Sequence, residues 1–333
     1  SLMSPFMSCG ARLTIFAVFT TAFFKTNGQN IVFALYLIGF LGAILTGFIL
    51  KKLFLRYESS PLILELPPYH LPQLSMLIFH TWVRLKRFLV RAGKFIIPFC
   101  ILISALNAIH LDGSLSFEES SQNSLLAWIG QALTPIFAPM GIHFDNWPAT
   151  VGLFTGVLAK EVVIATLNTL YSQVGHIALV KSEIFSLTLS LKQAFLSIWQ
   201  NLIHLEEAFK NPIWASTKDQ VFNSKALGVM SQRFGSKVAA FSYLIFIVLY
   251  IPCASTASAI AKELNQKWMV FSLFWNTFLA YAFAVIFYQC ATFFHHPLTT
   301  SLIVSSFILF TLTILIILKK NFFQFLNLQK QVS

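Results

Sequence analysis

Long apolar stretches alternate with shorter polar ones along the chain. Six of them have lengths and hydrophobicities that suit helices in a bilayer: residues 31–50, 95–109, 150–171, 237–252, 268–291 and 298–318. A transmembrane helix needs about 20 predominantly apolar residues. The pattern therefore predicts an all-α, polytopic integral membrane protein.

The composition agrees with this prediction. Of the 333 residues, 56% are hydrophobic and 11% are charged, whereas soluble domains carry about 25% charged residues. The net charge of +11 could attract nucleic acid. The lysines and arginines cluster beside the apolar stretches, however, as the positive-inside rule describes. We therefore expect the lipid bilayer, and no nucleic acid, to be the partner of this charge.

The distribution of charge also predicts a topology. Residues 51–94 are strongly basic and are expected in the cytoplasm. Within them, residues 73–91 alternate apolar and basic positions like an amphipathic helix that lies in the membrane interface. Residues 110–123 contain acidic residues but no lysine or arginine, and are expected outside. Residues 124–140 contain glycine and proline, which predicts an interfacial or re-entrant segment, and residues 150–171 are expected to return to the cytoplasm.

The polar residues 172–236 follow in this scheme as a small cytoplasmic helical insertion. The next stretch starts inside, yet the lysines that follow it also favour the inside. Residues 237–266 are therefore expected to form a re-entrant hairpin that breaks near Pro252, because proline removes a backbone donor. The last apolar spans end in a lysine pair, so the C-terminal tail, residues 321–333, is expected in the cytoplasm.

Two breaks of similar composition lie far apart in the chain. Pro5–Arg12 and Ile251–Thr256 both combine proline, cysteine and small residues, and the first precedes an apolar stretch, 13–24, that is too short to span alone. Each break is followed by apolar segments that end in a lysine pair, Lys51–Lys52 or Lys319–Lys320. The sequence thus predicts a weak internal repeat with a broken helix in each copy. In secondary transporters, paired broken helices mark a binding site near the membrane midplane.

A cysteine lies in each break, Cys9 in the first and Cys253 in the second. Thiolates are soft ligands for transition metals, and unwound backbone offers free carbonyl oxygens. Both cysteines are therefore candidate metal ligands. The alternative is that a cysteine is simply a small buried hydrophobic residue, and we assign that role to Cys100 and Cys290. Hydroxyl groups that could line the same path come from Ser8, Ser255 and Thr256.

An adjacent charged pair, Lys160 and Glu161, interrupts the apolar stretch 150–171. An ionised side chain at the bilayer centre costs about 2.5–3.5 kcal/mol on insertion scales. Neighbours on a helix point about 100° apart, so the two cannot simply neutralise each other. Glu161 is therefore a candidate metal ligand in a cation path that Lys160 also lines, with Asn168 on the same face. A structural ion pair with another helix is the alternative. Glu65 could form a gate or an elbow, or belong to a structural loop.

Longer motifs run through the whole chain: PFMSCGARL (5–13), ELPPYHLP (65–72), HTWVRLKRFLVRAGKFI (80–96), DNWPATVGLFTGVLAKEVVIATLNTLY (145–171) and IPCASTASAIAKELN (251–265). They resemble the membrane domain of FeoB-type bacterial ferrous iron transporters. The resemblance implies two gate regions, residues 1–58 (the second part of the first gate) and 237–320, around a central membrane region, residues 59–171. It also implies that Cys9 and Cys253 match gate cysteines of the iron path.

The resemblance further implies that Fe²⁺ is the transported ion, moved into the cytoplasm across the bacterial inner membrane. GTP and Mg²⁺ would belong to an N-terminal GTP-binding domain. This chain lacks that domain and the first membrane helices, so we expect a fragment or a split gene product. A small cytoplasmic accessory protein is a further implied partner.

No P-loop motif occurs in the sequence, so we expect that this chain is not an enzyme and holds no cofactor. Two alternative functions stay open. One is a transporter of another divalent metal, Mn²⁺ or Zn²⁺, and the other is a membrane-embedded thiol redox enzyme that uses Cys9 and Cys253 as a pair.

Overall fold

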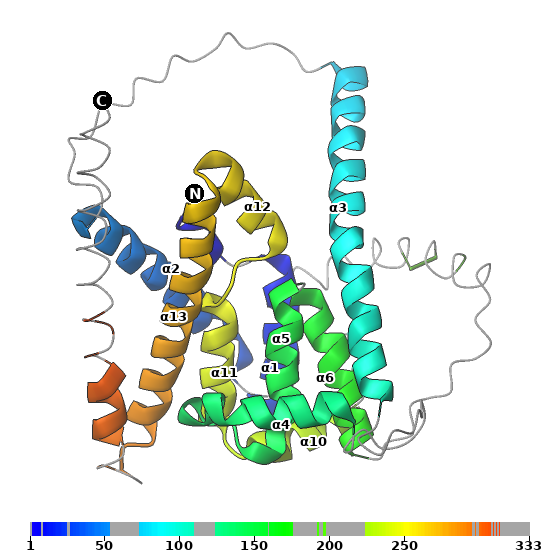
Figure 1. Ribbon diagram of the computed structural model, residues 1–333. Helices are drawn as coiled ribbons and strands as arrows, with labels where there is room; N and C mark the ends of the chain where they lie inside the picture. The colour runs from blue at the N-terminus through cyan, green and yellow to red at the C-terminus, as the bar shows by residue number, and fades with distance from the viewer. Residues whose placement is uncertain are drawn as a thin grey trace.

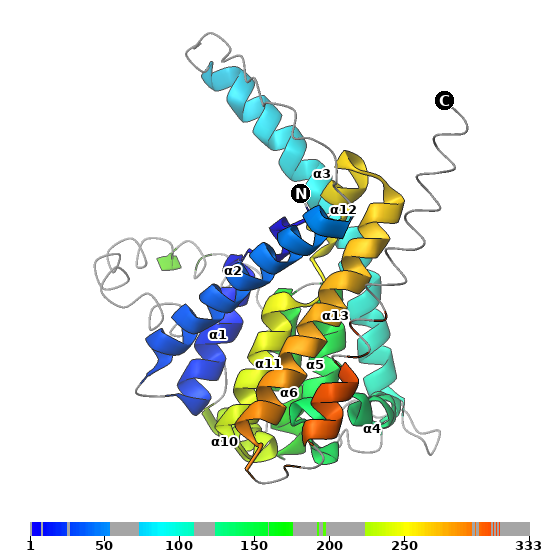
Figure 2. The ribbon, with the colours of Figure 1, turned by 90° about the vertical axis from the view of Figure 1, so that its left-hand side faces the viewer.

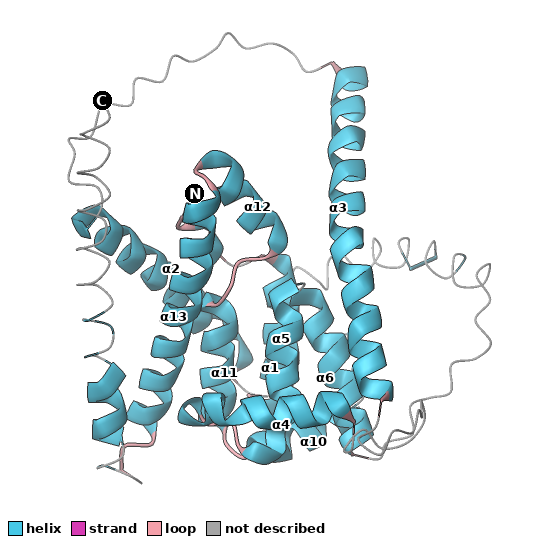
Figure 3. Ribbon diagram, viewed as in Figure 1, coloured by secondary structure: helices cyan, strands magenta, loops and turns pink. Residues whose placement is uncertain are grey.

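The computed structural model describes residues 2–7, 9–24, 27–53, 73–109, 124–158, 160–175, 192, 196–197, 224–294, 297, 300–307, 309, 311 and 313. Within these residues the regular elements are helices and no strand occurs, as Figure 3 shows, so the prediction of an all-α fold is confirmed. The α-helices are α1 (Gly10–Phe23), α2 (Gly28–Leu53), α3 (Leu74–Ala108), α4 (Leu125–Phe137), α5 (Trp147–Leu158), α6 (Lys160–Val174), α10 (Ser224–Phe234), α11 (Lys237–Leu249), α12 (Ala254–Glu263) and α13 (Gln266–Ala291). Short 3₁₀ helices are η1 (Ser4–Phe6), η3 (Ala138–Met140) and η4 (Phe144–Asn146).

Two helices are long and apolar enough to cross a membrane, Gly28–Lys52 in α2 and Gln266–Ala291 in α13. Two further pairs of helices meet this criterion together but are bent at a break. They are Leu125–Met140 with Phe144–Val157, bent by 116°, and Lys225–Phe234 with Lys237–Leu249, bent by 98°. The chain is thus a polytopic membrane protein in which part of the apolar helix is broken.

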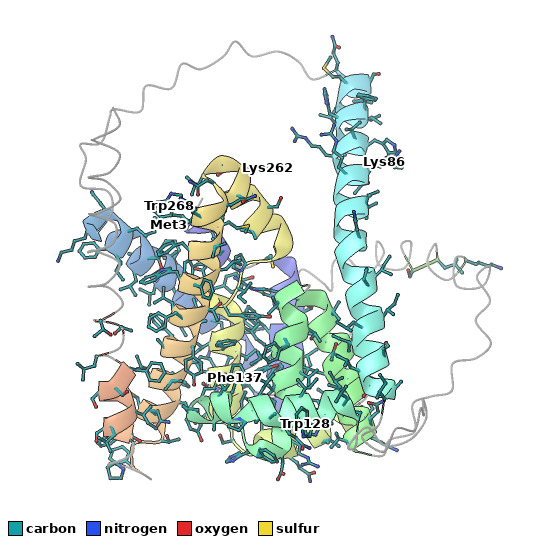
Figure 4. All side chains as sticks on the ribbon, viewed as in Figure 1. Met3, Lys86, Trp128, Phe137, Lys262 and Trp268 are labelled. Carbon is teal, nitrogen blue, oxygen red and sulfur yellow. The ribbon has the colours of Figure 1, made fainter. Side chains whose placement is uncertain are left out.

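The bundle has two ends that differ in charge. At one end lie the C-terminus of α2, with Lys51 and Lys52, and the turn between α12 and α13, with Lys262 and Lys267 (Figures 1 and 2). We call it the lysine end. At the other end α4 lies across the bundle beside α10, and we call it the α4 end. Figure 4 labels Lys262 at the lysine end and Trp128 in α4 at the opposite end.

An aromatic cluster fixes the helices at the α4 end. Phe19 on α1 stacks on Tyr243 of α11, with 5.3 Å between ring centroids, and meets Phe234 of α10 edge-on at 5.7 Å. The Tyr243 hydroxyl donates a hydrogen bond to the backbone carbonyl of Ala149 at 3.0 Å. Because these rings are buried and their geometry is specific, the cluster ties α1, α10 and α11 to the base of α5.

The predicted single span 150–171 is wrong, because α5 and α6 form a helical hairpin. A Cβ added to Gly152 would lie 2.8 Å from a methyl carbon of Leu167, and one added to Gly156 would lie 2.6 Å from a methyl carbon of Val163. In one straight helix Gly152 and Leu167 would be about 22 Å apart. The chain therefore reverses between Leu158 and Lys160, and α5 and α6 lie side by side (Figure 1).

The predicted hairpin over residues 237–266 is also wrong. The Ser242 hydroxyl donates to the backbone carbonyl of Ala284 at 2.9 Å, so α11 packs beside the C-terminal part of α13. Figures 1 and 2 show α11 rising from the α4 end, α12 continuing to the lysine end and α13 running back along both. Segment 237–266 thus connects opposite ends of the bundle. The charge pattern did require one re-entrant segment, but that segment is α5–α6.

This change affects the expected position of the polar insertion 172–236. Helix α6 ends and α10 begins at the α4 end, opposite the C-terminus of α2 (Figure 1). The described ends of segments 51–94 and 172–236 therefore lie at opposite ends of the bundle, whereas the sequence-based topology placed both segments on one side. That topology counted the hairpin as a complete crossing, which inverted the side of everything after it. The domain boundaries themselves stay predictions.

Helix α3 corrects another boundary. Residues 73–91, expected as a separate interfacial helix, and the expected span 95–109 form one continuous helix of 35 residues with Pro98 inside it. Its length is about 52 Å. Its N-terminal half extends beyond the rest of the bundle at the lysine end, where Figure 4 labels Lys86.

Candidate functional site

Each predicted break is the start of a half-helix with a cysteine at its N-cap. Cys9 precedes α1 and Cys253 precedes α12, and both have extended backbone angles. From the breaks, α1 runs toward the α4 end and α12 runs toward the lysine end (Figures 1 and 2). Proline-broken helices at both cysteines are therefore confirmed. Their opposite directions match the inverted arrangement in which transporters place broken helices around a central site.

The segment before Cys9 packs tightly between α2 and α11. Gly39 and Gly42 of α2 allow this approach, because a Cβ at Gly39 would lie 3.0 Å from the Phe6 carbonyl oxygen and one at Gly42 3.0 Å from Leu249. The Arg12 guanidinium, 2% exposed, donates to the carbonyl oxygens of Pro5 at 2.9 Å and Met7 at 3.1 Å. The first break is thus tied to α1 by one buried side chain.

The second break follows α11, the most completely buried helix described. Tyr250 and Pro252 are buried and Cys253 is half-buried. The Cys253 sulfur lies 3.2 Å from the Thr256 hydroxyl oxygen, within the first turn of α12. The break is therefore held in place mainly by the packing of its neighbours.

The tip of the α5–α6 hairpin reaches this second break. Gly156 packs so closely on Tyr250 that an added Cβ would overlap the Tyr250 hydroxyl. The Lys160 side chain is 3% exposed, and its ammonium lies 4.8 Å from the centroid of the Tyr250 ring. A cation over an aromatic face is attracted by the ring quadrupole, which offsets part of the cost of burying the charge. The charged pair thus lies at a helix turn and not in the middle of a span.

These three segments form one junction between the ends of the bundle. The segment before Cys9 lies next to the end of α11, which leads into the second break, since Phe6 and Leu249 both lie against Gly42 of α2. Tyr250 in turn contacts Lys160 at the hairpin tip. The two breaks and the start of α6, which come from distant parts of the chain, therefore lie in one region of the fold.

The other predicted residues have different positions. Thr256 contacts Cys253, and Asn168 is half-buried two turns further along α6. Glu161 lies in the first turn of α6 and Ser255 in that of α12, but their side chains lie outside the described residues, as do Ser8 and Glu65 entirely. Cys290 is exposed near the end of α13, far from the junction, so its expected role as a small buried residue is wrong.

Sequence reasoning missed two members of the junction, Arg12 and Tyr250. Arg12 had a signal, since it is a lone charge that directly follows a break and precedes an apolar run. The hairpin also had one, because Gly152 and Gly156 are spaced as the small residues that let membrane helices approach closely. Tyr250 had no signal that distinguishes it from a core aromatic residue.

The junction offers few strong metal ligands. Among the described residues, no group of three or more His, Cys, Asp or Glu side chains could hold a metal ion. The side-chain donors described there are two thiols and the Thr256 hydroxyl, and the carbonyl oxygens of Pro5 and Met7 already accept hydrogen bonds from Arg12. A site that passes an ion onward must bind it weakly enough to release it.

A polytopic bundle with paired half-helices and a re-entrant hairpin defines a gate-type membrane protein. The family model described as "Nucleoside recognition" (Gate) matches residues 89–267, and the model described as "Ferrous iron transport protein B C terminus" matches residues 32–84. The chain belongs to the FeoB ferrous iron transport protein family, and it corresponds to the C-terminal membrane part.

Two relatives illustrate the similarity. The chain is 53% identical over 296 residues to the Fe(2+) transporter FeoB of Legionella pneumophila (strain Lens), covering 89% of this chain and 39% of the relative. It is 45% identical over 329 residues to the Fe(2+) transporter FeoB of Salmonella typhimurium (strain LT2), covering 96% of this chain and 42% of the relative. The chain thus spans about two fifths of the length of these relatives. No solved structure matches it.

Proposed function

We propose that this chain is the membrane permease part of a GTP-regulated Fe²⁺ uptake transporter. The relatives named as Fe(2+) transporters support iron as the cargo. The observation that carries the proposal is that Cys9 and Cys253 are the N-caps of two half-helices that run in opposite directions (Figures 1 and 2). Two N-cap thiols give a path that a borderline transition-metal ion can enter after losing part of its hydration shell.

The balance of charge at the junction supports this path. Arg12 and Lys160 are buried cations that would repel a divalent ion. Thiolates at Cys9 and Cys253 together with the Glu161 carboxylate would supply more negative charge than the two cations neutralise. An N-cap also favours a negative group, because it lies at the positive end of the helix dipole. In this proposal Glu161 contributes charge and a hard oxygen ligand, and Thr256 contributes a hydroxyl.

The lysine end is the cytoplasmic side in our proposal, because Lys51, Lys52, Lys262 and Lys267 cluster there, as the positive-inside rule requires. Residues 300–307 begin beside Gln289 at the α4 end and reach Tyr281 further along α13. They therefore run toward the lysine end, which supports a cytoplasmic C-terminus. The insertion 172–236 would lie on the external side of the bacterial inner membrane, and not inside as the sequence-based topology had it.

We infer that GTP and Mg²⁺ bind in the part of the full-length protein that precedes this chain. That part, or a separate gene product, would set the open or closed state of the gate, and a small cytoplasmic accessory protein would act on it. This chain would contribute the path and no catalysis.

The test uses full-length protein in vesicles and radiolabelled Fe²⁺. Cys9→Ser and Cys253→Ser should each lower uptake at least about tenfold, and the double variant should cost little more, because residues that act as a unit are not additive. Cys290→Ser is the matched control and should transport normally. Independent, multiplying losses, or no loss, would show that the cysteines do not form one path.

The same vesicles distinguish the alternatives. Fe²⁺ should protect Cys9 and Cys253 from alkylation, and Mn²⁺ and Zn²⁺ should compete only at higher concentration. Thiol–disulfide exchange without metal, together with absent uptake, would favour a redox enzyme. Glu161→Gln should lower uptake while the protein still inserts into the membrane, since the change removes charge and keeps size. Normal uptake in that variant would exclude Glu161 from the path.

A further inference from the structure

Helix α13 presents one side to the surroundings and the other to the bundle. Phe274 is 75% exposed, whereas Asn276, two residues later, is 0% exposed. Ala280 and Ala284 follow Asn276 at helical spacing and are equally buried, so they share its inner face. Asn276 lies about 15 Å from the start of this helix. A large polar side chain is thus buried well inside a membrane-spanning helix.

Asn276 lies level with the start of the second break. The Phe246 ring on α11 lies 6.5 Å from the Tyr281 ring on α13, measured between centroids. The two helices run in opposite directions (Figure 2). Ile251, where the break begins, is five positions after Phe246. Asn276 is five positions before Tyr281, so the antiparallel packing places it beside the break that leads into Cys253.

The residue before Asn276 connects this part of α13 to α2. The Trp275 indole N–H donates a hydrogen bond to the Thr46 hydroxyl oxygen at 3.3 Å. Thr46 lies one helical turn from Gly42. Phe6, from the segment of the first break, and Leu249, at the end of α11, both lie against Gly42. Asn276 is therefore held close to the place where the segments of the two breaks meet.

The Asn276 amide is only partly satisfied in this position. Its Nδ2 donates to the Ser272 hydroxyl oxygen at 3.2 Å, one turn earlier on α13. Its Oδ1 is buried and has no hydrogen-bond partner among the described residues. The same holds for the hydroxyl oxygen of Tyr250, which directly precedes the break. Buried polar atoms are rarely left without a partner, and an ion or an ordered water is a common one. The second break thus has oxygen atoms that can accept such a partner.

We propose that Asn276 is an oxygen ligand for the transported ion at the second break. The inference rests on the iron path proposed above and adds a ligand from a third helix. Carbonyl oxygens suit hard ions such as Mn²⁺ and Mg²⁺, and thiolates suit softer ions. A site that combines the two suits Fe²⁺, which lies between these classes. The amide is neutral, so it adds a ligand without adding charge, and the ion can still leave.

The first test replaces Asn276 by leucine in full-length protein. Asn276→Leu keeps the approximate volume and removes the amide. We expect the KM for Fe²⁺ uptake in vesicles to rise about tenfold, the lower end of the losses seen when a group that supports a metal site is removed. Without added iron, the protein should unfold at the same or a higher temperature, because an unsatisfied buried oxygen has been removed. A normal KM, or a raised KM with unfolding at lower temperature, would overturn the proposal.

Gln289→Leu is the matched control, since Gln289 is a second buried amide on the same helix. Both ends of this amide are satisfied: Nε2 donates to the Pro139 carbonyl oxygen at 2.9 Å, and Oε1 accepts from the Thr300 hydroxyl at 3.2 Å. Loss of these bonds should lower the unfolding temperature and leave the KM for uptake normal. An equal rise in KM in both variants would mean that uptake responds to any buried amide of α13, which would also overturn the proposal.

Asn276→Asp decides the question if the leucine variant does not reach the membrane. Aspartate presents an oxygen whichever way its side chain is turned, and it adds a negative charge. The KM should fall, and the maximal rate should fall with it, because an ion that is held more tightly leaves more slowly. Any other change, or no change, would count against Asn276 as a ligand.

Cys9→Ser and Cys253→Ser, measured in the same vesicles, separate this inference from the iron path on which it rests. Impaired cysteine variants with a normal Asn276→Leu would refute the ligand and leave the path intact. Normal cysteine variants with a raised KM in Asn276→Leu would refute the thiol path and support Asn276 as a ligand of the ion.

Discussion

The two breaks carry the same residue at the same N-cap position but differ in how they are held. At the first, a three-residue 3₁₀ helix precedes Cys9, and the Arg12 side chain fixes it through two carbonyls. At the second, the fully packed α11 precedes Cys253, and Tyr250 and Pro252 are buried. Cys9 is exposed and Cys253 is half-buried.

This difference has a physical consequence for gating. A segment with few buried contacts opens at lower free energy than one inside the core. The Cys9 break is held by the buried Phe6 and by two hydrogen bonds from Arg12, whereas the Cys253 break follows a whole buried helix and cannot move without displacing α11. We therefore expect the Cys9 side to supply the motion of the gate and the Cys253 side to act as the fixed wall.

The largest expected effect is a difference in labelling between the two ends of segment 237–266, which tests whether the half-helices α1 and α12 run in opposite directions. Ser236→Cys and Gln266→Cys, each in a protein without its native cysteines, should react with a membrane-impermeant reagent from opposite faces. The reason is that α11 and α12 together connect the two ends of the bundle (Figure 2). Lys52→Cys should label from the same face as Gln266→Cys. Labelling of positions 236 and 266 from one face would mean that residues 237–266 form a re-entrant hairpin after all. It would also mean that α1 and α12 are not an inverted pair of half-helices.

The second largest effect is expected at the Cys253 break, which we take to be the fixed wall of the gate. Gly156→Ala places a methyl group against the Tyr250 hydroxyl and within 2.6 Å of Val163, and overpacking of this kind costs about 1–3 kcal/mol. Thermal unfolding should occur at lower temperature, and alkylation of Cys253 should change more than that of Cys9.

A second substitution makes this prediction specific. Tyr250→Phe removes the hydroxyl that the new methyl group meets, so the double variant should recover part of the lost stability. The control is Gly228→Ala on α10, where an added Cβ meets nothing within 4 Å. If Gly156→Ala changed the alkylation rate of Cys9 as strongly as that of Cys253, the two breaks would not be held independently.

Much of the fold was accessible from the sequence. Hydrophobic runs predicted the helices, and proline beside cysteine predicted both breaks, because these signals act locally. The reversal between Leu158 and Lys160 was missed, since the run 150–171 is apolar enough to be one span and contains no proline after Pro148. The signal lay in the Gly152 and Gly156 spacing, which reports packing and not hydrophobicity.

The candidate site was accessible in part. The sequence marks the break beside which Cys253 and Thr256 lie, and it marks Lys160 as a charge in an apolar run. These signals are local, so these residues could be predicted. The partners of these residues come from tertiary packing: Tyr250 meets Lys160 only after α5–α6 folds back, and the two breaks approach each other only when α1 packs on α11. A single sequence carries no direct record of such contacts.

The smallest expected effect concerns the contact of Thr256 with Cys253. Thr256→Val keeps the shape and removes the hydroxyl that lies 3.2 Å from the sulfur. A hydrogen bond of this kind is worth about 0.5–1.5 kcal/mol. Fe²⁺ uptake should fall about threefold, within the range that this energy allows. Thr277→Val on α13 is the control, since Thr277 donates to a backbone carbonyl of its own helix, that of Leu273 at 2.8 Å. Equal losses in both variants would mean that the Thr256 hydroxyl has no special role.

The central claim is that Cys9 and Cys253, from two oppositely directed half-helices, bind one metal ion together. Titration of the purified full-length protein with Co²⁺ tests this claim directly, because a thiolate-to-cobalt charge-transfer absorption band reports metal–sulfur bonds. The metal sites of any N-terminal domain are first filled with Mg²⁺. We predict that one equivalent of Co²⁺ saturates the band, that Cys9→Ser and Cys253→Ser each weaken it without changing the stoichiometry, and that Fe²⁺ displaces it. Two equivalents of Co²⁺, of which each substitution removes one, would contradict a shared site.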